Sequence, residues 1–440
     1  MFCMIDFLKC IRYIKIEKIS FSVFSTVKNI TKGVGEMAIK EYQKWFKDAR
    51  LGLFIHWGLY SLLGRGEWAM MRERYTNEEY AKIADDFTAQ DFDMESWFEF
   101  AEKCGVKYMV FTTRHHDGFA LWDSKADAFN SMNSPAHRDF VAEFTEGCRR
   151  HNMKVGLYFS LGDWRYGFPK ENDSFEKAEK MRDLTYAQLR EIMTNYGKID
   201  LLWYDGGWCY PSLPSDTAKE VAEFWRADEL NAMVRSLQPE IMINNRSGKP
   251  EDFSTPEGVL GRHSENLCEA CFTLGENYNC YWGYNKSETI HKTPAELMYL
   301  VTSTIAAGNN ILINVGPDGN GIIPDWQRDL MLELGSWVNS HKEAVFEVDW
   351  TNIANDRNFT NGNQFGVVAE GKDAYYFYIR NYPENWTFIP VFNAKIKDAF
   401  FIENGVKVDF EHRNGGIMLR NLPAVPPDKR CSVVKLIKEK

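Results

Sequence analysis

The sequence lacks several features that would place the chain in other classes of protein. None of its apolar runs reaches the roughly 18 residues needed to cross a bilayer. Basic residues are outnumbered: 52 Lys and Arg against 62 Asp and Glu give a formal charge of −10. A negative chain is a poor partner for nucleic acid or for an anionic membrane surface. We therefore expect no nucleic acid and no membrane among its partners.

A disulfide framework is also missing, because the nine cysteines are scattered and odd in number. This usage favours reduced thiols and a cytoplasmic location. Cys268 and Cys271 form a C-x-x-C pair with Cys280 nearby, but a zinc site needs a fourth ligand, usually from a second pair. The pair does not open a helix after a strand, as a redox motif would. We interpret these residues as reduced, partly buried thiols.

Two common catalytic signatures are absent. No G-x-x-x-x-G-K-[ST] phosphate loop occurs, and no G-x-S-x-G nucleophile elbow occurs. Their absence argues against a P-loop enzyme and against an α/β-hydrolase. The chain also shows no internal repeat and no low-complexity tract.

The first 36 residues differ from the rest of the chain. Four basic residues between Lys9 and Lys18 interrupt an otherwise apolar stretch, so the uninterrupted apolar core of a secretory signal is missing. We expect residues 1–36 to be a poorly ordered extension, with Met37 as the natural start. A basic amphipathic helix lying on a membrane is the alternative.

From residue 38 onward, strand-like and helix-like segments alternate. Short apolar runs cover 51–57, 108–113, 154–160, 199–204, 240–244 and 310–315. Helical spacing covers 77–104, 139–151, 174–196, 217–237, 293–305 and 325–340. This alternation is typical of a parallel sheet with helical crossovers. We predict an α/β fold with a (β/α)8-like, TIM-type barrel over residues 37–343, its two remaining strands lying between 247 and 290.

The period changes after about residue 343. Short strands separated by Gly, Asn and Pro turns cover 365–369, 374–379, 386–392, 399–402, 406–410, 417–419 and 432–437. Such a pattern is typical of antiparallel sheets. We predict that residues 344–440 form a C-terminal antiparallel β-sandwich.

A carboxylate follows the fourth predicted barrel strand. The apolar run from Ile199 to Trp203 leads directly into Tyr204, Asp205 and two glycines. A carboxylate at the end of a buried strand is costly unless it is hydrogen-bonded or functional, and catalytic groups sit at the C-terminal ends of barrel strands. Tryptophans on both sides, Trp203 and Trp208, offer flat apolar faces to a sugar. We interpret Asp205 as the nucleophile of a glycoside hydrolase.

Polar side chains follow the other predicted strands as well. They are His56 after the first, Arg114 to Asp117 after the second, Ser160 and Asp163 after the third, and Asn244 to Arg246 after the fifth. In a barrel these strand ends face the same side. His56, His115, His116 and Asp117 are an alternative ligand set for zinc or iron. Adjacent histidines on a strand point to opposite faces, and the His-x-His spacing of metal barrels is absent, so we favour hydrogen bonding to sugar hydroxyls.

Taken in order, these motifs resemble glycoside hydrolase family 29, the α-L-fucosidases. The matching segments are Trp45 to Gly58, Glu67-Trp68, His115 to Phe119, Trp203 to Trp208, Asn244 to Arg246, Trp282 to Tyr284 and Asn309 to Pro317. The resemblance covers roughly residues 41 to 345, and more loosely the C-terminal β domain. Together the segments are highly specific, although no single one would be.

The resemblance implies a retaining double displacement with no metal and no other cofactor, acting on a fucosylated oligosaccharide or glycoconjugate. Asp205 matches the nucleophile of the family. The positions implied to bind the sugar are Phe54, His56, Glu67, Trp68, His115, His116, Tyr158, Trp203, Arg246 and Trp282. The sequence specifies neither the linkage that is cleaved nor the oligomeric state, and a homo-oligomer is compatible with it.

The acid/base has two candidates, because the family places it in a variable loop. Glu257 lies 52 residues after Asp205 (257 − 205), in a segment that resembles one family pattern. Glu269 lies 64 residues after it (269 − 205), but Cys268 replaces the tryptophan of the matching pattern. We prefer Glu257. The chain also departs from the family at 245–248, where Asn-Arg-Ser-Gly replaces the usual Asp-Arg-Trp-Gly. Two other functions stay open: a metal-dependent barrel hydrolase and a catalytically silent fucose-binding protein.

Overall fold

A computed structural model describes residues 39–167, 174–207, 217–264, 266–276, 281–353 and 365–439. The expected N-terminal extension, together with Trp208 and Cys280, lies outside these ranges. The segment Ile39–Lys440 forms one compact unit. The domain boundary between residues 343 and 344 therefore stays a prediction.

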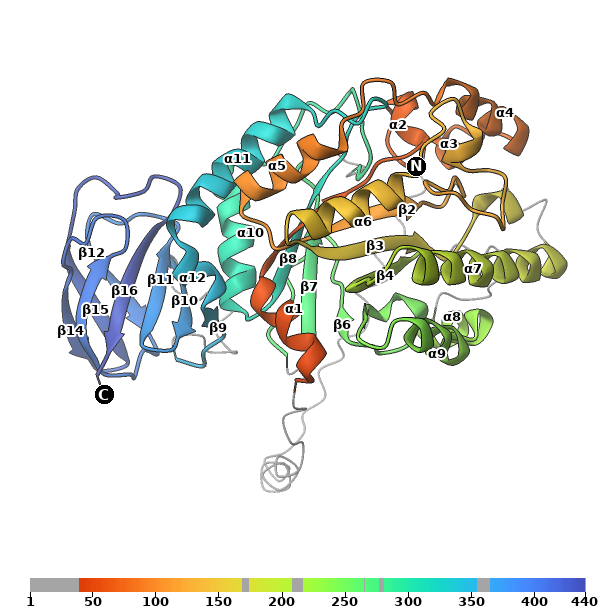
Figure 1. Ribbon diagram of the computed structural model, residues 1–440. Coiled ribbons are helices and arrows are strands. Elements are labelled where there is room, and N and C mark those ends of the chain that lie inside the picture. Colours follow the sequence, from red (N-terminus) through yellow and green to blue (C-terminus); the bar gives the residue numbers. More distant parts are fainter. Residues whose placement is uncertain are drawn as a thin grey trace, which may run out of the picture. The chain divides into compact units, whose positions relative to one another are not determined.

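Eight parallel strands of the described chain form the barrel (Figure 1). They are β1 (Leu51–Ile55), β2 (Tyr108–Arg114), β3 (Lys154–Ser160), β4 (Leu201–Asp205), β5 (Met242–Ile243), β6 (Phe253–Ser254), β7 (Leu267–Phe272) and β8 (Asn310–Val315). Strand β8 pairs back with β1, and a parallel bridge between Asn244 and Phe253 closes the sheet between β5 and β6. The predicted barrel is confirmed. Its two missing strands are β6 and β7, in the expected interval.

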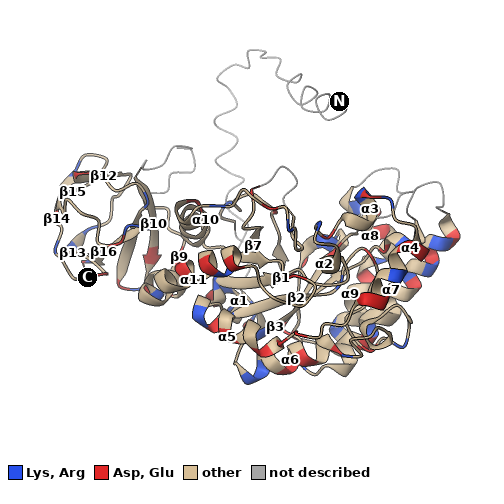
Figure 2. Ribbon diagram, turned by 90° about the horizontal axis from the view of Figure 1, so that it is seen from above, with Lys and Arg blue, Asp and Glu red and all other residues tan. Residues whose placement is uncertain are grey.

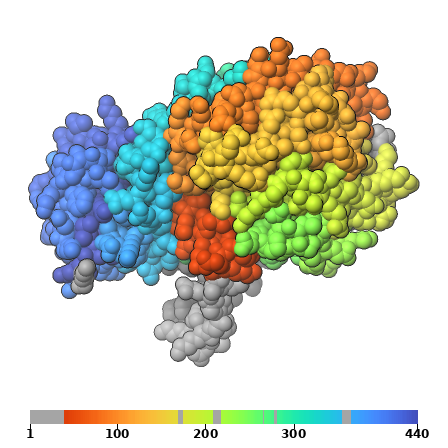
Figure 3. Space-filling view, viewed as in Figure 1, coloured from red at the N-terminus to blue at the C-terminus, as the bar shows by residue number. Residues whose placement is uncertain are grey.

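Helices surround the barrel, and in Figure 3 the segments coloured orange to green form its surface on one side. The longer ones are α5 (Met94–Cys104), α6 (Phe140–Arg150), α7 (Phe175–Asn195), α8 (Ala218–Trp225), α9 (Ala227–Leu237), α10 (Pro294–Ala306) and α11 (Asp325–Ser340). The shorter ones are α1 (Lys44–Ala49), α2 (Tyr60–Leu63), α3 (Ala69–Arg72), α4 (Asn77–Ala81) and α12 (Lys342–Phe346). Turns of 3-10 helix are η2 (Glu41–Gln43), η3 (Lys82–Asp86), η4 (Ser131–Asn133), η5 (Trp164–Tyr166) and η7 (Asn245–Ser247).

Two expected helices are divided. The segment 77–104 becomes α4, η3 and α5, and the segment 217–237 becomes α8 and α9. The second break falls at Arg226, whose φ of 48° lies in the left-handed region that ends a helix. Charged residues are spread over the helices (Figure 2), whereas each strand of the barrel carries at most one Lys, Arg, Asp or Glu. No helix among the described residues is long and apolar enough to cross a bilayer.

The C-terminal part is built from two antiparallel sheets, as predicted. Their strands are β9 (Val348–Asp349), β10 (Gly366–Gly371), β11 (Ala374–Ile379), β12 (Asn385–Pro390), β13 (Ile396–Phe401), β14 (Asp409–Arg413), β15 (Gly416–Leu422) and β16 (Ser432–Lys438). The order is β13-β16-β11-β10-β9 in one sheet and β12-β15-β14 in the other. Side chains such as Phe377 and Ile417 form their shared core. The indole of Trp337 on α11 donates to the Cys431 carbonyl at 2.8 Å, which ties this part to the barrel.

Candidate active site

A cavity of about 90 Å³ lies at the C-terminal ends of the barrel strands. It is lined by Phe54, His56, Trp68, His115, His116, Tyr158, Trp203, Asp205, Arg246, Glu257 and Trp282. The structure thus brings together all of the predicted site residues except Glu67 and Glu269. Since these side chains come from segments more than 200 residues apart, the barrel topology is what assembles them.

Asp205 ends β4 with its carboxylate held on both oxygens. The Tyr158 hydroxyl donates to Oδ2 at 2.9 Å, and Nη1 of Arg246 donates to Oδ1 at 2.9 Å. Burial acts to raise the pKa of Asp205, but the positive charge of Arg246 outweighs it, with smaller help from His116 and Tyr158, so the pKa lies below its ordinary value. The group is therefore suited to act as an ionised carboxylate.

Arg246 connects the two acidic groups of the cavity. Its Nη1 contacts Asp205, while its Nη2 donates to Oε2 of Glu257 at 2.8 Å. Its Nε donates to the Thr255 hydroxyl at 2.9 Å, and its guanidinium lies 4.5 Å from the ring centre of Trp203. Thr255 was not predicted as a site residue, although it lies in the segment that resembles the family's acid/base pattern. These contacts fix the guanidinium plane between the two carboxylates.

Glu257 follows β6 and reaches the cavity from its rim. Its side chain is 45% exposed. The backbone around it is fastened to β7, because Cys271 N donates to the Pro256 carbonyl at 3.1 Å and Gly258 N donates to the Cys271 carbonyl at 3.0 Å. Glu257 thus combines a fixed backbone with a carboxylate that is accessible from solvent.

Glu269 lies inside the barrel, on β7, and is completely buried. The Trp203 indole donates to its Oε1 at 2.9 Å, and the Tyr108 hydroxyl donates to its Oε2. Burial raises its pKa to about 7. Glu269 therefore contacts Trp203, which lines the cavity, but is not itself part of the lining.

Glu67 has a comparable place behind Trp282. Its Oε2 accepts hydrogen bonds from the backbone N–H groups of Trp282 at 3.0 Å and of Gly283 at 2.7 Å. Burial raises the pKa of Glu67 to about 7. Through these two hydrogen bonds Glu67 holds the backbone of the loop that carries Trp282.

The hydrogen bonds of His116 determine which of its nitrogens carries the proton. Ser160 Oγ donates to the Gly162 carbonyl at 2.6 Å, so it accepts from Nδ1–H of His116, also at 2.6 Å. Burial lowers the pKa of His116 to about 4, so the ring is neutral at pH 7. Its Nε2, which lies 3.7 Å from Asp205, is therefore the unprotonated nitrogen and an acceptor.

His56 repeats this arrangement with Asn314. The amide nitrogen of Asn314 donates to the Trp282 carbonyl at 2.7 Å, so its oxygen accepts from Nδ1–H of His56 at 2.7 Å. Burial lowers the pKa of His56 to about 3, which leaves Nε2 as an acceptor. Neither Ser160 nor Asn314 was predicted as a partner of a histidine, although both lie in segments that the motifs had marked.

His115 and His116 both reach the cavity because β2 ends at Arg114, immediately before them. The strand alternation that would separate them no longer applies. Burial lowers the pKa of His115 well below its ordinary value. Its Nδ1 is buried and lacks a hydrogen-bond partner within the described part of the chain. A buried polar atom of this kind is costly unless a ligand satisfies it.

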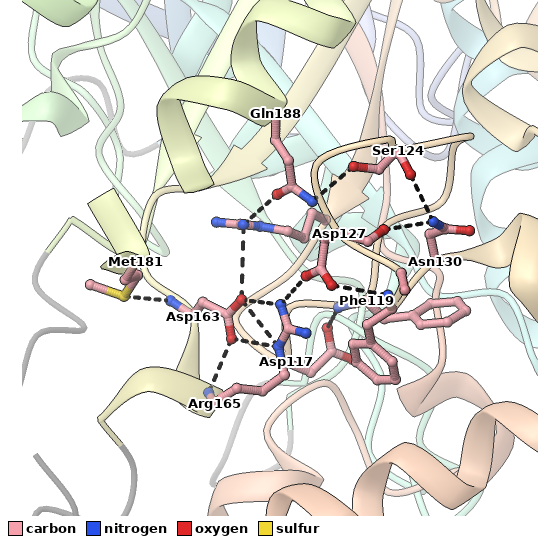
Figure 4. A network of polar contacts seen from close by, with 12 residues as sticks. Asp117, Phe119, Ser124, Asp127, Asn130, Asp163, Arg165, Met181 and Gln188 are labelled. Carbon is pink, nitrogen blue, oxygen red and sulfur yellow. Dashed lines mark hydrogen bonds and ion pairs between the residues drawn. The ribbon is translucent and has the colours of Figure 1, made fainter. Parts of the chain in front are cut away.

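A buried ionic network supports these strand ends from behind (Figure 4). Arg114 donates to the Ser160 carbonyl at 2.6 Å and to Gln188 on α7 at 2.5 Å. Asp163, 3.9 Å from Arg114, is bound by Arg165 at 2.6 Å. Burial acts to raise the pKa of Asp163, but Arg165 and Arg114 lower it overall. The network fixes the end of β2, which directly precedes the two histidines, and the end of β3, which carries Ser160.

The alternative metal site receives no ligand set within the described residues. No group of three His, Cys, Asp or Glu side chains is arranged there to hold an ion. The Asp117 carboxylate instead accepts from the Tyr80 hydroxyl at 2.7 Å and from Phe119 N at 3.1 Å. Cys268 and Cys271 are reduced and buried on β7, where residues three apart face opposite sides of a strand.

Comparison with known proteins gives a consistent family. The model of the α-L-fucosidase family matches residues 24–343. The chain is 28% identical to the α-L-fucosidase of Dictyostelium discoideum over 87% of this chain and 89% of that protein. It is 30% identical to a putative α-L-fucosidase of Caenorhabditis elegans over 69% and 66%, and 27% identical to the human tissue α-L-fucosidase over 87% and 85%.

Solved structures agree with these relatives. Isoenzyme 1 of the α-L-fucosidase from Paenibacillus thiaminolyticus superposes with a TM-score of 0.80 at 29% identity, over 91% of this chain and 99% of that one. A family 29 α-L-fucosidase from Bacteroides thetaiotaomicron superposes with a TM-score of 0.79 at 25% identity, over 91% and 97%. That second structure holds a covalent intermediate, trapped with 2-fluoro-fucosyl fluoride in a glutamate-to-glutamine variant.

Proposed function

The chain belongs to the α-L-fucosidase family of glycoside hydrolases, and from this premise we propose that it removes terminal α-L-fucose from oligosaccharides or glycoconjugates through a covalent fucosyl ester of Asp205. One observation carries the proposal: a single guanidinium, that of Arg246, contacts both Asp205 and Glu257 in one cavity. Two carboxylates held this way are close to each other. Retention needs a separation of about 5–5.5 Å.

In the first step Asp205 attacks the anomeric carbon and forms the ester, while Glu257 donates a proton to the departing oxygen. In the second step Glu257 takes a proton from water, which attacks the same carbon and releases fucose with its configuration retained. The lowered pKa of Asp205 favours this role, because an ionised carboxylate is both a nucleophile and a stabiliser of the oxocarbenium-like transition state.

The histidines provide recognition of the sugar in this proposal. The unprotonated Nε2 atoms of His56 and His116 are acceptors, so each is suited to receive a hydrogen bond from a hydroxyl group. A site built to bond hydroxyls rejects sugars that lack them or misplace them. The small volume, about 90 Å³ against the roughly 300–1,000 Å³ of pockets for drug-sized ligands, favours one terminal ring over an internal segment of a chain.

Burial supports Glu257 rather than Glu269 as the acid/base. A general acid must come within hydrogen-bond reach of the leaving oxygen. Glu257 lines the cavity and is 45% exposed, whereas Glu269 is completely buried and both of its oxygens already accept hydrogen bonds from Tyr108 and Trp203.

The test compares wild type and Asp205→Ala on p-nitrophenyl α-L-fucoside, with circular dichroism as the check on folding. We expect turnover by wild type and its near-complete loss in the variant. Azide added to Asp205→Gly should restore turnover and give the azide of inverted configuration. Equal rates in wild type and Asp205→Ala would overturn the role of Asp205, and no turnover of any fucoside by wild type would overturn the function.

A further inference from the structure

A second, larger hollow adjoins the cavity. It has a volume of about 510 Å³, and its lining includes Glu257, Phe272, Trp282, Lys292 and Tyr299. Glu257 and Trp282 also line the cavity of Asp205. The two spaces therefore meet at the carboxylate that is proposed to protonate the departing oxygen. That oxygen joins fucose to its leaving group, so the hollow lies where a leaving group must extend.

Tyr299 on α10 offers an aromatic surface to the hollow and is 48% exposed. One face of its ring is covered by Arg380, whose guanidinium lies 4.4 Å from the ring centre. Arg380 is fixed in turn, because its Nη1 donates to Ser303, one turn further along the same helix, at 2.5 Å. A ring held on one side and open on the other suits the apolar face of a pyranose.

Lys292 supplies a buried hydrogen-bond donor in the same hollow. Its side chain is only 10% exposed, and its ammonium group contacts Glu276 at 2.5 Å and the Gly275 carbonyl at 3.0 Å. An ammonium has three N–H donors. Within the described residues two of the three are therefore assigned, which leaves one for a hydroxyl or a carbonyl of a ligand.

The charge of the lining limits the ligand further. Glu257 must be protonated to act as the general acid, so the charged groups of the lining are the carboxylates of Glu276 and Glu296 and the ammonium of Lys292, for a formal charge of −1 (1 − 2). The Lys292 charge is matched by its contact with Glu276, so no cation of the lining is left to pair with an anionic ligand. An anionic group entering this space would meet like charge.

We propose that this hollow is the leaving-group subsite and that it takes a neutral sugar while disfavouring a sulfated or carboxylated one. This inference rests on the fucosidase function proposed above. Stacking on Tyr299 and a hydrogen bond from Lys292 would hold the neutral ring, and Glu276 and Glu296 would set the preference against negative charge.

The experiment measures kcat/KM on three substrates in 20 mM buffer. A panel of fucosyl disaccharides first identifies the linkage that is cleaved best; this disaccharide is then compared with its counterpart carrying a sulfate on the leaving sugar. The third substrate is α-L-fucosyl fluoride, whose leaving group is one atom and does not fill the hollow. We expect wild type to prefer the neutral disaccharide by about three- to tenfold, and less at 0.5 M salt, because salt screens the repulsion.

Variants of the lining separate stacking from charge. Tyr299→Ala should lower the ratio of kcat/KM for the neutral disaccharide to that for the fluoride by about tenfold. The double variant Glu276→Gln with Glu296→Gln should bring the preference against sulfate close to one; glutamine at 296 keeps the capping box with Thr293. Glu99→Gln, an exposed acidic residue on α5 that lines neither space, is the matched control for charge and should leave both ratios unchanged.

Equal kcat/KM for the neutral and sulfated disaccharides at low salt would overturn the charge preference. A Tyr299→Ala variant that loses the same factor on the disaccharide and on the fluoride would overturn the subsite. If wild type cleaves the fluoride but either of these two results is found, the subsite inference fails and the proposed function stands. If wild type cleaves none of the three, the proposed function fails with it.

Discussion

The indole nitrogen of Trp203 donates a hydrogen bond of 2.9 Å to the buried carboxyl group of Glu269. The guanidinium of Arg246 lies 4.5 Å from the centre of the same ring and contacts Asp205. Glu269 therefore acts on the site through the orientation of one of its walls. Such a residue can reduce activity when it is replaced although it exchanges no proton with the substrate.

Azide distinguishes this role from that of the acid/base. Glu257→Ala should lose about 10²- to 10⁴-fold in kcat on substrates with poor leaving groups, keep activity on dinitrophenyl fucoside, and give a fucosyl azide of retained configuration. Glu269→Ala should lose activity on all substrates alike and gain nothing from azide, since its leaving-group step keeps its proton donor. Azide rescue of Glu269→Ala with a retained product would reverse the assignment.

Glu269 also makes stability depend on pH. Burial raises its pKa from 4.5 to about 7, so the folded protein binds a proton that the unfolded chain releases. Its stabilising protonated form is fully present below the unfolded pKa, and this contribution is lost as pH rises through the folded pKa. In Glu269→Gln the side chain cannot ionise, so this pH-dependent loss of stability should be absent. The free energy of unfolding of the variant, relative to wild type, should rise by about 3 kcal/mol between pH 4.5 and 7 in urea titrations.

A flat difference between the two proteins over that pH range would contradict the prediction. Glu99→Gln on the surface serves as the control and should show no such trend.

Removal of Arg246 should move the acidic limb of the pH profile upward. Arg246 is the main group that lowers the pKa of Asp205 against the effect of burial. In Arg246→Gln, burial dominates and the pKa of Asp205 rises. The variant should therefore lose activity at a higher pH than wild type when the solution is acidified. We expect the limb of kcat/KM on p-nitrophenyl fucoside to shift to higher pH, with kcat/KM at its maximum reduced about ten- to hundredfold. A lower rate with an unchanged limb would show that Arg246 does not control Asp205.

Ser160→Ala tests the proton position on His116. The variant leaves Nδ1–H of His116 without its acceptor, so the tautomer with an unprotonated Nε2 is no longer favoured. We expect the loss to fall mainly on KM, by about tenfold. The ¹⁵N shifts of the histidine ring should show a mixture of the two neutral forms. Unchanged shifts in the variant would contradict the assignment.

The fold was predictable because strands and helices alternate with distinct periods over most of the barrel. Strands β1 to β4 and β8 were visible as apolar runs of five to seven residues. Strand β5 lies within the predicted run 240–244, although only two of these residues form the strand, whereas β6 has only two residues and is too short for a period to appear. The break between α8 and α9 depends on the left-handed backbone of Arg226, and neither Gly nor Pro stands at this position to indicate that a helix ends.

The site was predictable at the strand ends and less so between them. His56, His116 and Asp205 follow apolar runs, and barrel geometry brings such positions together. Their partners Ser160 and Asn314 come from other strands, so their roles depend on contacts in space. Spacing also could not separate the two glutamates. Glu269 pairs with Asn310, the first residue of β8, and so lies deep in the barrel instead of at its rim.

The closure of the barrel has a consequence for how the specificity of such an enzyme changes during evolution. The sheet is joined between β5 and β6 by strands of two residues and one bridge, from Asn244 to Phe253. Arg246 and Glu257 lie on the two sides of this seam, whereas Asp205 ends a five-residue strand inside a continuous ladder. Insertions at the seam break few backbone hydrogen bonds. Laboratory selection for new acceptors should therefore accumulate changes of loop length at 245–258 and leave 201–206 intact.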